Sequence, residues 1–531
     1  MAALAAAVPL VALVAIAFSG GGDSRWGIVG DTAGRTGGTT LILMLGVAVS
    51  TAAIGTVTAW LTTSFDFPGR RVLSSALVLP LAVPTYIAAY CFTEFLHATG
   101  PVQTAIRDLF GFRTSREYWF PDIRSLGGAI AILSLVLYPY VFLTVRALLA
   151  VQGRSIREAA AILGAGEFQS FWRVLVPLAR PAVATGVALV LMETVNDIGA
   201  VEALGVRTTT FAIYSTWLNG NDLQGATRIA MAMLVFVLLL VFVERFARRK
   251  QAFASSGSDR QGASPVQLRG AKAAGAALLC TLPVLGGFGI PFYVLADYSS
   301  RRLSLLLEPA LWDALRNTVM VAGAAGVVAV IIALCTIFAV RLTGSGPLRF
   351  LSRMASVGYA IPGTVLAIGL LVPLAAFDNA LDAWMRANLG TSTGLLLSGS
   401  GFAVVYAASA RFAAMSQGAV ENGFASLPPS LDMAARGFGC SATRMLREIF
   451  LPLLRPALVT AFLLVFVETA KELSATILLR PFGFETLATY VYAQASRAAF
   501  EDGALAALLI VLAGILPVAL LRRTVDPPSR L

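Results

Sequence analysis

Two short polar runs interrupt the apolar stretches of this chain, and their residue types could do chemistry. Each run places three polar or charged side chains at positions i, i+3 and i+4: Glu193, Asn196 and Asp197, then Glu468, Lys471 and Glu472. On a helix this spacing puts the three side chains on one face. Charges inside an apolar span are costly, so they normally face a bundle interior or a water-filled path. Two interpretations follow: the runs line a path for a polar cargo, or they pair between helices, with Lys471 neutralising an acidic neighbour.

Other kinds of site chemistry are missing from the sequence. The chain has three lysines, Lys250, Lys272 and Lys471, and none follows a glycine, so no GxxxxGK[ST] phosphate loop exists. Any ATP would therefore be bound by another chain. The single histidine, His97, and four scattered cysteines without a CxxC motif give no metal cluster and no nucleophile–base arrangement. We expect no enzymatic activity, no cofactor bound by this chain and no firmly assigned metal site.

The composition places the elements that must position these residues in a membrane. Of 531 residues, 57% are hydrophobic and 13% are charged, whereas soluble domains carry about 25% charged residues. Backbone groups in lipid must be satisfied within helices or a closed barrel, and the runs lack the alternation of barrel strands. We therefore predict an all-α integral membrane protein with about twelve transmembrane helices. The expected spans are 2–18, 40–61, 72–96, 127–149, 181–201, 229–244, 271–295, 318–340, 353–376, 395–415, 457–478 and 502–521.

A polar signature between the spans occurs twice. Glu158 and Met433 begin the two copies, 275 residues apart, and the spacing from glycine to proline is thirteen residues in both. The first copy consists of Glu158, Ala159, Ala160, Gly164 and Pro177, and the second of Met433, Ala434, Ala435, Gly439 and Pro452. The likeness continues downstream, where residues 210–214 resemble residues 486–490. A polar loop repeated together with its flanking spans indicates a duplicated module.

The local structure of the first copy follows from its residue types. We expect a short amphipathic helix from Glu158 to Gly164, where the glycine permits a sharp reversal. A second short helix near 167–175 should end at Pro177. Pro181 should then open the next membrane helix, because its missing N–H costs nothing there.

The duplication divides the chain into two modules of similar size. Residues 1–250 form the first transmembrane module, and residues 271–531 form the second. Residues 251–270 between them are Ser/Gly-rich and follow a basic run, which predicts a solvated cytoplasmic linker. Six spans per module give both modules the same orientation, so the repeat is parallel, with pseudo-twofold symmetry.

The charge distribution predicts the topology. The net charge of +11 could suggest nucleic acid, but the basic residues follow the positive-inside rule once both signature loops are placed in the cytoplasm. Both termini are then cytoplasmic. The largest outward segments, 97–126 and 198–228, are long enough to dock another protein. The first span, 2–18, lacks a basic leading region and is expected to be a retained helix rather than a signal peptide.

The repeated signature resembles the EAA loop of ABC importer permeases. The first copy fits at Glu158, Ala159, Ala160, Gly164 and Pro177. In the second copy Met433 replaces the acidic residue, and Asp432 stands one position earlier. The resemblance implies that both loops contact ATP-binding subunits and transmit their motion. The coupling residues of the second loop would then be Asp432, Ala434, Ala435, Gly439 and Pro452.

Over nearly its whole length the chain resembles the fused two-module permeases of ferric-iron ABC importers. This likeness implies a multi-pass protein of the bacterial cytoplasmic (inner) membrane, in contact with membrane lipid and not with nucleic acid. The implied partners are two copies of an ABC ATP-binding subunit, which carry ATP and Mg²⁺, and a periplasmic binding protein that delivers iron(III). Thiamine, polyamine or phosphonate stay open as cargo. The rival classes are an ion-coupled secondary transporter and a membrane enzyme or scaffold.

Overall fold

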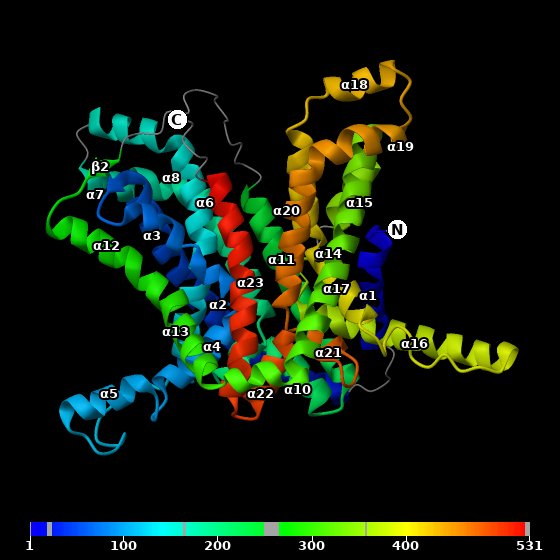
Figure 1. Ribbon diagram of the computed structural model, residues 1–531, viewed down its shortest axis with the longest axis horizontal. Coiled ribbons are helices and arrows are strands. Elements are labelled where there is room, and N and C mark those ends of the chain that lie inside the picture. The colour runs from blue at the N-terminus through cyan, green and yellow to red at the C-terminus, as the bar shows by residue number, and fades with distance from the viewer. Residues whose placement is uncertain are drawn as a thin grey trace. The chain divides into compact units, whose positions relative to one another are not determined.

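The computed structural model describes residues 2–18, 24–162, 166–248, 265–355, 358–359 and 361–525 (Figure 1). This part of the chain is almost entirely helical and forms two compact units, each drawing on both halves of the sequence. The first unit comprises residues 1–29, 213–234 and 304–494, and the second comprises residues 30–212, 235–303 and 495–531. The units therefore do not coincide with the two predicted modules, whose boundaries stay a prediction.

The first unit is built on three long helices that pack against one another. They are α14 (Pro309–Thr343), α17 (Phe402–Ala425) and α20 (Leu451–Ala470). Their shared core contains Ala325, Ala329, Ala408, Phe412 and Val465, and small residues of this kind let membrane helices approach closely. The unit also holds α1 (Ala2–Phe18), η4 (Leu303–Leu307), α15 (Gly346–Ala355), α16 (Gly363–Leu389), α18 (Ser430–Gly437), α19 (Ala442–Met445), the π-helical turn η6 (Leu446–Phe450), α21 (Thr476–Leu479) and α22 (Leu487–Ser496).

The second unit packs α6 (Leu126–Ile162) against α8 (Val176–Asn196). A Cβ atom at Gly186 would lie 2.6 Å from the Cα atom of Val141, so this close packing requires glycine. The unit's other elements are α2 (Ser24–Ser64), β1 (Phe65–Asp66), α3 (Arg70–Ala76), η1 (Leu79–Ala82), α4 (Thr85–Leu96), α5 (Pro101–Phe110), α7 (Glu167–Ser170), the π-helical turn η2 (Phe171–Leu175), α9 (Gly199–Ala203), β2 (Val266–Gln267), α12 (Ala271–Val284), the π-helical turn η3 (Leu285–Gly289), α13 (Ile290–Arg301) and α23 (Phe500–Val525). Helices α10 (Thr209–Leu218) and α11 (Leu223–Arg248) contribute to both units.

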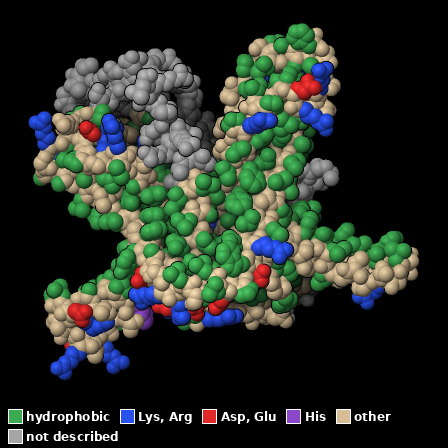
Figure 2. Space-filling view, in the orientation of Figure 1, with side chains coloured by type: hydrophobic (Ala, Val, Ile, Leu, Met, Phe, Trp, Pro, Cys, Tyr) green, Lys and Arg blue, Asp and Glu red, His purple; other side chains and the backbone are tan. Residues whose placement is uncertain are grey.

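The all-α membrane fold is confirmed, with fewer uninterrupted spans than the sequence predicts. Among the described residues, eight helices are long and apolar enough to cross a membrane, or nine if the bent pair 70–82 and 85–110 forms one span. Figure 2 shows mostly hydrophobic side chains along α14 and α20, as lipid contact requires. Four predicted spans differ: 2–18 and 229–244 lie in shorter apolar helices, 72–96 is bent by 97°, and 395–415 carries the buried Arg411.

The C-terminal end of the predicted linker, residues 251–270, contains a short β-strand. Val266 and Gln267 form β2, which pairs in parallel with Phe65 and Asp66 of β1. Residues 251–264 of this segment lie outside the described part of the chain.

The two copies downstream of the polar runs align with an offset of 278 residues, two more than the predicted match of 210–214 with 486–490. Gly205 and Gly483 both adopt left-handed backbone conformations, with φ of 68° and 74°. Helices α10 and α22 begin and end at positions that differ by 278. A threonine hydroxyl accepts the first backbone N–H of each helix: Thr40 from Thr209 at 3.0 Å and Thr318 from Leu487 at 2.8 Å. The sequence comparison missed the 278-residue offset because the two copies repeat the backbone conformation of the turn before the helix, and not the side chains around it.

Candidate functional site: two coupling loops and two broken helices

The second signature loop folds as a helix, a glycine reversal and a second helix. Helix α18 ends at Gly437, and Gly439 follows with φ of 69° in the left-handed region. A Cβ atom at Gly439 would meet nothing within 4 Å, so the requirement for glycine is conformational rather than steric. Ser441 then caps α19 by accepting the N–H of Arg444 at 3.3 Å. The chain reverses here because Gly439 adopts the left-handed conformation and Ser441 caps the helix that follows.

Arginine Arg341 and an aromatic cluster fasten the second loop to the rest of its unit. The Arg341 Nε atom donates to Asp432 Oδ2 at 2.8 Å, and its Nη1 atom donates to the Phe424 carbonyl at 2.6 Å. The guanidinium also lies over the rings of Phe424 and Phe450, at 5.3 and 5.1 Å, a favourable cation–π placement. Ala435 is buried in the same cluster.

The outward face of the second loop is apolar. The Asp432 carboxylate, one position before Met433, is engaged by Arg341 of the same chain and is mostly buried. At the matching position the Met433 side chain is 68% exposed, and Phe438 beside the reversal is 88% exposed. Ala434 lies between Met433 and the buried Ala435 on α18.

The first loop is described only in part. Glu158, Ala159 and Ala160 lie on the last turns of α6, which continues without a break from the membrane span to Ile162. Their side chains, and Gly164, lie outside what the structure describes. A separate short amphipathic helix from 158 to 164 was predicted, and the continuous α6 corrects this.

Both prolines of the signature sit within continuous helix rather than ending one, which corrects a second prediction. Immediately before Pro177 and before Pro452, the chain makes a π-helical turn, at residues 171–175 and 446–450. In each copy the residue before the proline donates its N–H to the carbonyl five residues earlier. The wider turn accommodates the proline ring, which would clash in a regular α-helix. Pro181 likewise lies inside α8 instead of opening it.

The two polar runs lie where helices break, so only part of each run keeps the predicted helical face: Glu193 and Asn196 share α8, whereas Asp197 lies beyond its end. Helix α8 ends at Asn196, and Asp197 adopts an extended conformation before α9 begins at Gly199. Helix α20 ends at Ala470, before Lys471 and Glu472. In both copies a carboxylate accepts a backbone N–H at the start of the short helix that follows. Asp197 Oδ1 accepts the Ala200 N–H and Glu472 Oε1 accepts the Ala475 N–H, each at 2.9 Å.

In the second copy the charges of the run are paired within the chain. Lys471 Nζ lies 2.7 Å from Glu468 Oε1. Glu472 forms an ion pair with Arg411 of α17, and both side chains are less than a tenth exposed. In the first copy Asn196 and Asp197 are buried and Glu193 is partly buried. The run at 468–472 is thus a neutralised cluster at a helix break.

Residues 52–251 and 325–530 each match one family, described as the binding-protein-dependent transport system inner membrane component. The chain belongs to this family. It is therefore a multi-pass membrane permease subunit of the ABC importer type, and the same family unit occurs twice along it.

Three relatives show the range of similarity of this permease. The "Fe(3+)-transport system permease protein FbpB 2" of Haemophilus influenzae is 24% identical over 91% of the chain and 88% of its own length. The "Ferric transport system permease protein FbpB" of Actinobacillus pleuropneumoniae is 24% identical over 76% of the chain and 58% of its own length. The "Sulfate transport system permease protein CysT" of Escherichia coli is 29% identical over 40% of the chain and 76% of its own length.

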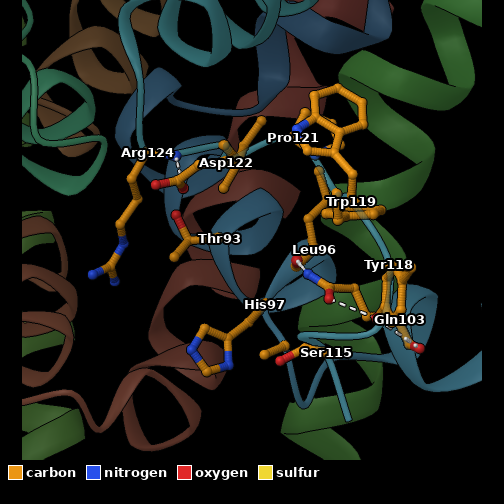
Figure 3. A pocket seen from close by; sticks show the side chains of 13 residues that line it. Thr93, Leu96, His97, Gln103, Ser115, Tyr118, Trp119, Pro121, Asp122 and Arg124 are labelled. Carbon is orange, nitrogen blue, oxygen red and sulfur yellow. Dashed lines mark hydrogen bonds between the residues drawn. The ribbon is translucent and has the colours of Figure 1, made fainter. Parts of the chain in front are cut away.

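The predicted outward segment 97–126 of the permease folds over a polar cavity of about 360 Å³. Gln103 spans its wall: its Nε2 atom donates to the Leu96 carbonyl and its Oε1 atom accepts the Tyr118 hydroxyl, both at 2.8 Å (Figure 3). His97, the one histidine of the sequence, also lines it. The cavity is a candidate contact surface for a partner outside the membrane.

Sequence reasoning missed two residues of the broken-helix site of the permease. Arg411 is a lone arginine inside the predicted span 395–415, and that isolation was a signal for a buried ion pair. Gly363 opens α16 beside the pair, and a Cβ atom there would lie 3.0 Å from Glu472 Oε1 and 3.2 Å from Arg411 Nη1. No sequence pattern singles out this glycine, because the requirement arises from a contact distant in the chain.

Proposed function

We propose that this permease is the transmembrane subunit of an ATP-driven importer that moves iron(III) delivered by a periplasmic binding protein. The proposal of iron(III) as cargo rests on the alignment of one ferric-transport relative over 91% of the chain and 88% of its own length. That relative therefore matches both copies of the family unit within a single chain. The E. coli sulfate relative is more similar where it aligns, but it covers only 40% of this chain.

The coupling loops are the proposed seats for two ATP-binding subunits, which carry ATP and Mg²⁺. On the second loop, the exposed Met433 and Phe438 supply an apolar surface for such a subunit. A continuous helical segment of 29 residues, Ala442–Ala470, connects this loop to the break at Lys471. In the first copy residues 171–196 form an equivalent segment that ends at Asp197. In this proposal, movement imposed on a loop is carried along the continuous helical segment to the polar break.

The polar breaks are the proposed lining of the path. Charged side chains at a span are tolerated beside other charges or a water-filled cavity. In this proposal Glu193, Asn196 and Asp197 face the cargo from one copy, and the Glu468–Lys471 pair faces it from the other. The loops and both termini then lie in the cytoplasm, and the segment 97–126 faces the binding protein.

Uptake of radiolabelled iron by a strain lacking this gene tests the cargo. Iron uptake should fall in the deletion strain and return when the intact chain is supplied in trans, while labelled sulfate uptake should stay unchanged. Wild-type iron uptake in the deletion strain would contradict the iron assignment. Loss of sulfate uptake instead would favour the sulfate cargo named for the E. coli relative.

A further inference from the structure

Two tyrosines, one from each copy, meet through their hydroxyl groups. The Tyr214 hydroxyl of α10 lies 3.0 Å from the Tyr492 hydroxyl of α22, and these two helices are labelled near each other in Figure 1. The Tyr492 side chain is 8% exposed, and Tyr214 is partly buried. Both residues belong to the first compact unit.

The two tyrosines occupy the same position in the repeat. They are separated by 278 residues, which is the offset fixed by the paired glycines Gly205 and Gly483 and by the ends of the two helices. A contact between equivalent positions of two copies lies on the local twofold axis that relates them. A translocation path that followed such an axis would pass the tyrosine pair.

The chemistry of the pair suits a hard cation. Phenol oxygens become hard, anionic ligands when they lose a proton, and hard oxygen ligands suit hard cations. Around an octahedral ion with metal–oxygen distances of about 2.0–2.1 Å, adjacent ligands lie about 2.9 Å apart. The 3.0 Å separation of the two hydroxyls therefore matches two neighbouring coordination positions without movement of either helix. Two protein ligands leave the remaining positions to water or a chelator, which favours a brief stay over tight binding.

We propose that Tyr214 and Tyr492 form a transient two-phenolate contact for iron(III) on the translocation path. Each phenol that binds releases its proton to water, and its oxygen replaces one water or chelator oxygen on the ion, which stays iron(III) throughout. The inference rests on the proposed function, because iron must enter the path for the contact to matter.

The visible spectrum of the purified permease–ATPase complex, titrated with the nitrilotriacetate chelate of iron(III), tests the contact. Coordinated phenolate gives a charge-transfer band with iron(III) that neither the chelate nor a carboxylate produces. We expect the band in the wild-type complex, about half its intensity in Tyr214→Phe or Tyr492→Phe, and no band in the double variant. Tyr490→Phe is the matched control, since Tyr490 is also buried on α22 and its equivalent in the first copy is Ala212. This variant should keep the full band.

Two results would overturn the inference: no band in the wild-type complex, or a band that persists in the double variant. Elution of each variant as an intact complex controls for misfolding. Iron uptake in the deletion strain reports separately on the proposed function. Uptake without a band rejects the tyrosine contact alone. A band without uptake shows that the two phenols can bind iron(III), but it rejects iron as the transported cargo and with it the role of the pair in transport.

Discussion

The Arg341 Nε atom lies 2.8 Å from Asp432 Oδ2, and this ion pair ties α18 of the second coupling loop to the end of α14. Both side chains are mostly buried, so the pair is worth more than an exposed one. It orients the loop so that Met433, rather than the acidic residue, faces outward. Under the proposed coupling role, a loop that transmits force must be held firmly to the helices it moves.

Asp432→Asn should loosen the second loop. The charged hydrogen bond from Arg341 contributes about 1.5–3 kcal/mol, so its weakening should raise deuterium exchange across residues 430–437 and lower binding-protein-stimulated ATP hydrolysis several-fold. Asp297→Asn, which removes a more exposed pair with Arg301, serves as the control and should change neither quantity. Unchanged exchange across 430–437 in Asp432→Asn would show that the pair does not anchor the loop.

Gly439→Val should uncouple ATP hydrolysis from uptake. A β-branched residue in the left-handed region costs about 1–2 kcal/mol, so the reversal between α18 and α19 should shift while the rest of the unit stays folded. We expect iron uptake to fall at least several-fold with basal ATP hydrolysis retained. Gly437→Ala, two residues earlier inside α18 and with open space at its Cβ, should behave as wild type. Equal uptake by both variants would argue against a coupling role for the reversal.

Removing one partner of the Arg411–Glu472 ion pair should destabilise the folded permease more than removing both. Arg411→Met leaves a buried carboxylate unpaired, which costs about 3–5 kcal/mol, and should lower the melting temperature of the detergent-solubilised permease strongly. The double variant Arg411→Met/Glu472→Gln removes both charges and should recover a large part of the loss. Additive losses in the double variant would show that the two side chains do not interact.

The stability of the turn at residues 113–117 should depend on pH. Backbone N–H groups of Arg113 and Thr114, together with the Thr114 hydroxyl, bond the exposed Glu117 carboxylate. The Arg113 bond is the largest cause holding the Glu117 pKa below its ordinary value of 4.5. Because the folded pKa is lowered, the stabilisation is present above pH 4.5 and is lost as pH falls through the folded pKa.

Deuterium exchange of residues 111–118, corrected for the intrinsic pH dependence of exchange, measures this transition. The wild-type turn should lose protection as the pH is lowered below 4.5, whereas Glu117→Gln should show a flat profile. A wild-type profile without a transition would mean that the carboxylate does not hold the turn.

Features that depend on local sequence could be predicted, and the glycine reversal is an example. It was predicted at Gly164, and at the equivalent Gly439 the structure shows the left-handed conformation that glycine permits. The duplication was visible for the same reason, since both copies keep the spacing from glycine to proline. The all-α membrane class followed from apolar runs without strand alternation, because such runs satisfy their backbone groups in lipid only as helices.

Features that depend on contacts distant in the chain could not be predicted. The sequence showed Asp432 one position before the expected acidic residue, but it could not show that Asp432 pairs with Arg341, 91 residues away. The helix breaks at Asp197 and Lys471 contain no proline, so the apolar pattern gave no reason to end α8 or α20 there. The π-helical turns before Pro177 and Pro452 were missed because a proline ordinarily indicates the end of a helix.

Uptake by proteoliposomes that contain the permease and its ATPase partner tests the central claim most directly. With iron-loaded binding protein outside and ATP inside, labelled iron should accumulate in the proteoliposomes. Iron accumulation should stop when ATP is omitted, and it should persist when ionophores collapse the ion gradients. Uptake that continues without ATP and disappears with the gradients would contradict the account and identify an ion-coupled carrier instead.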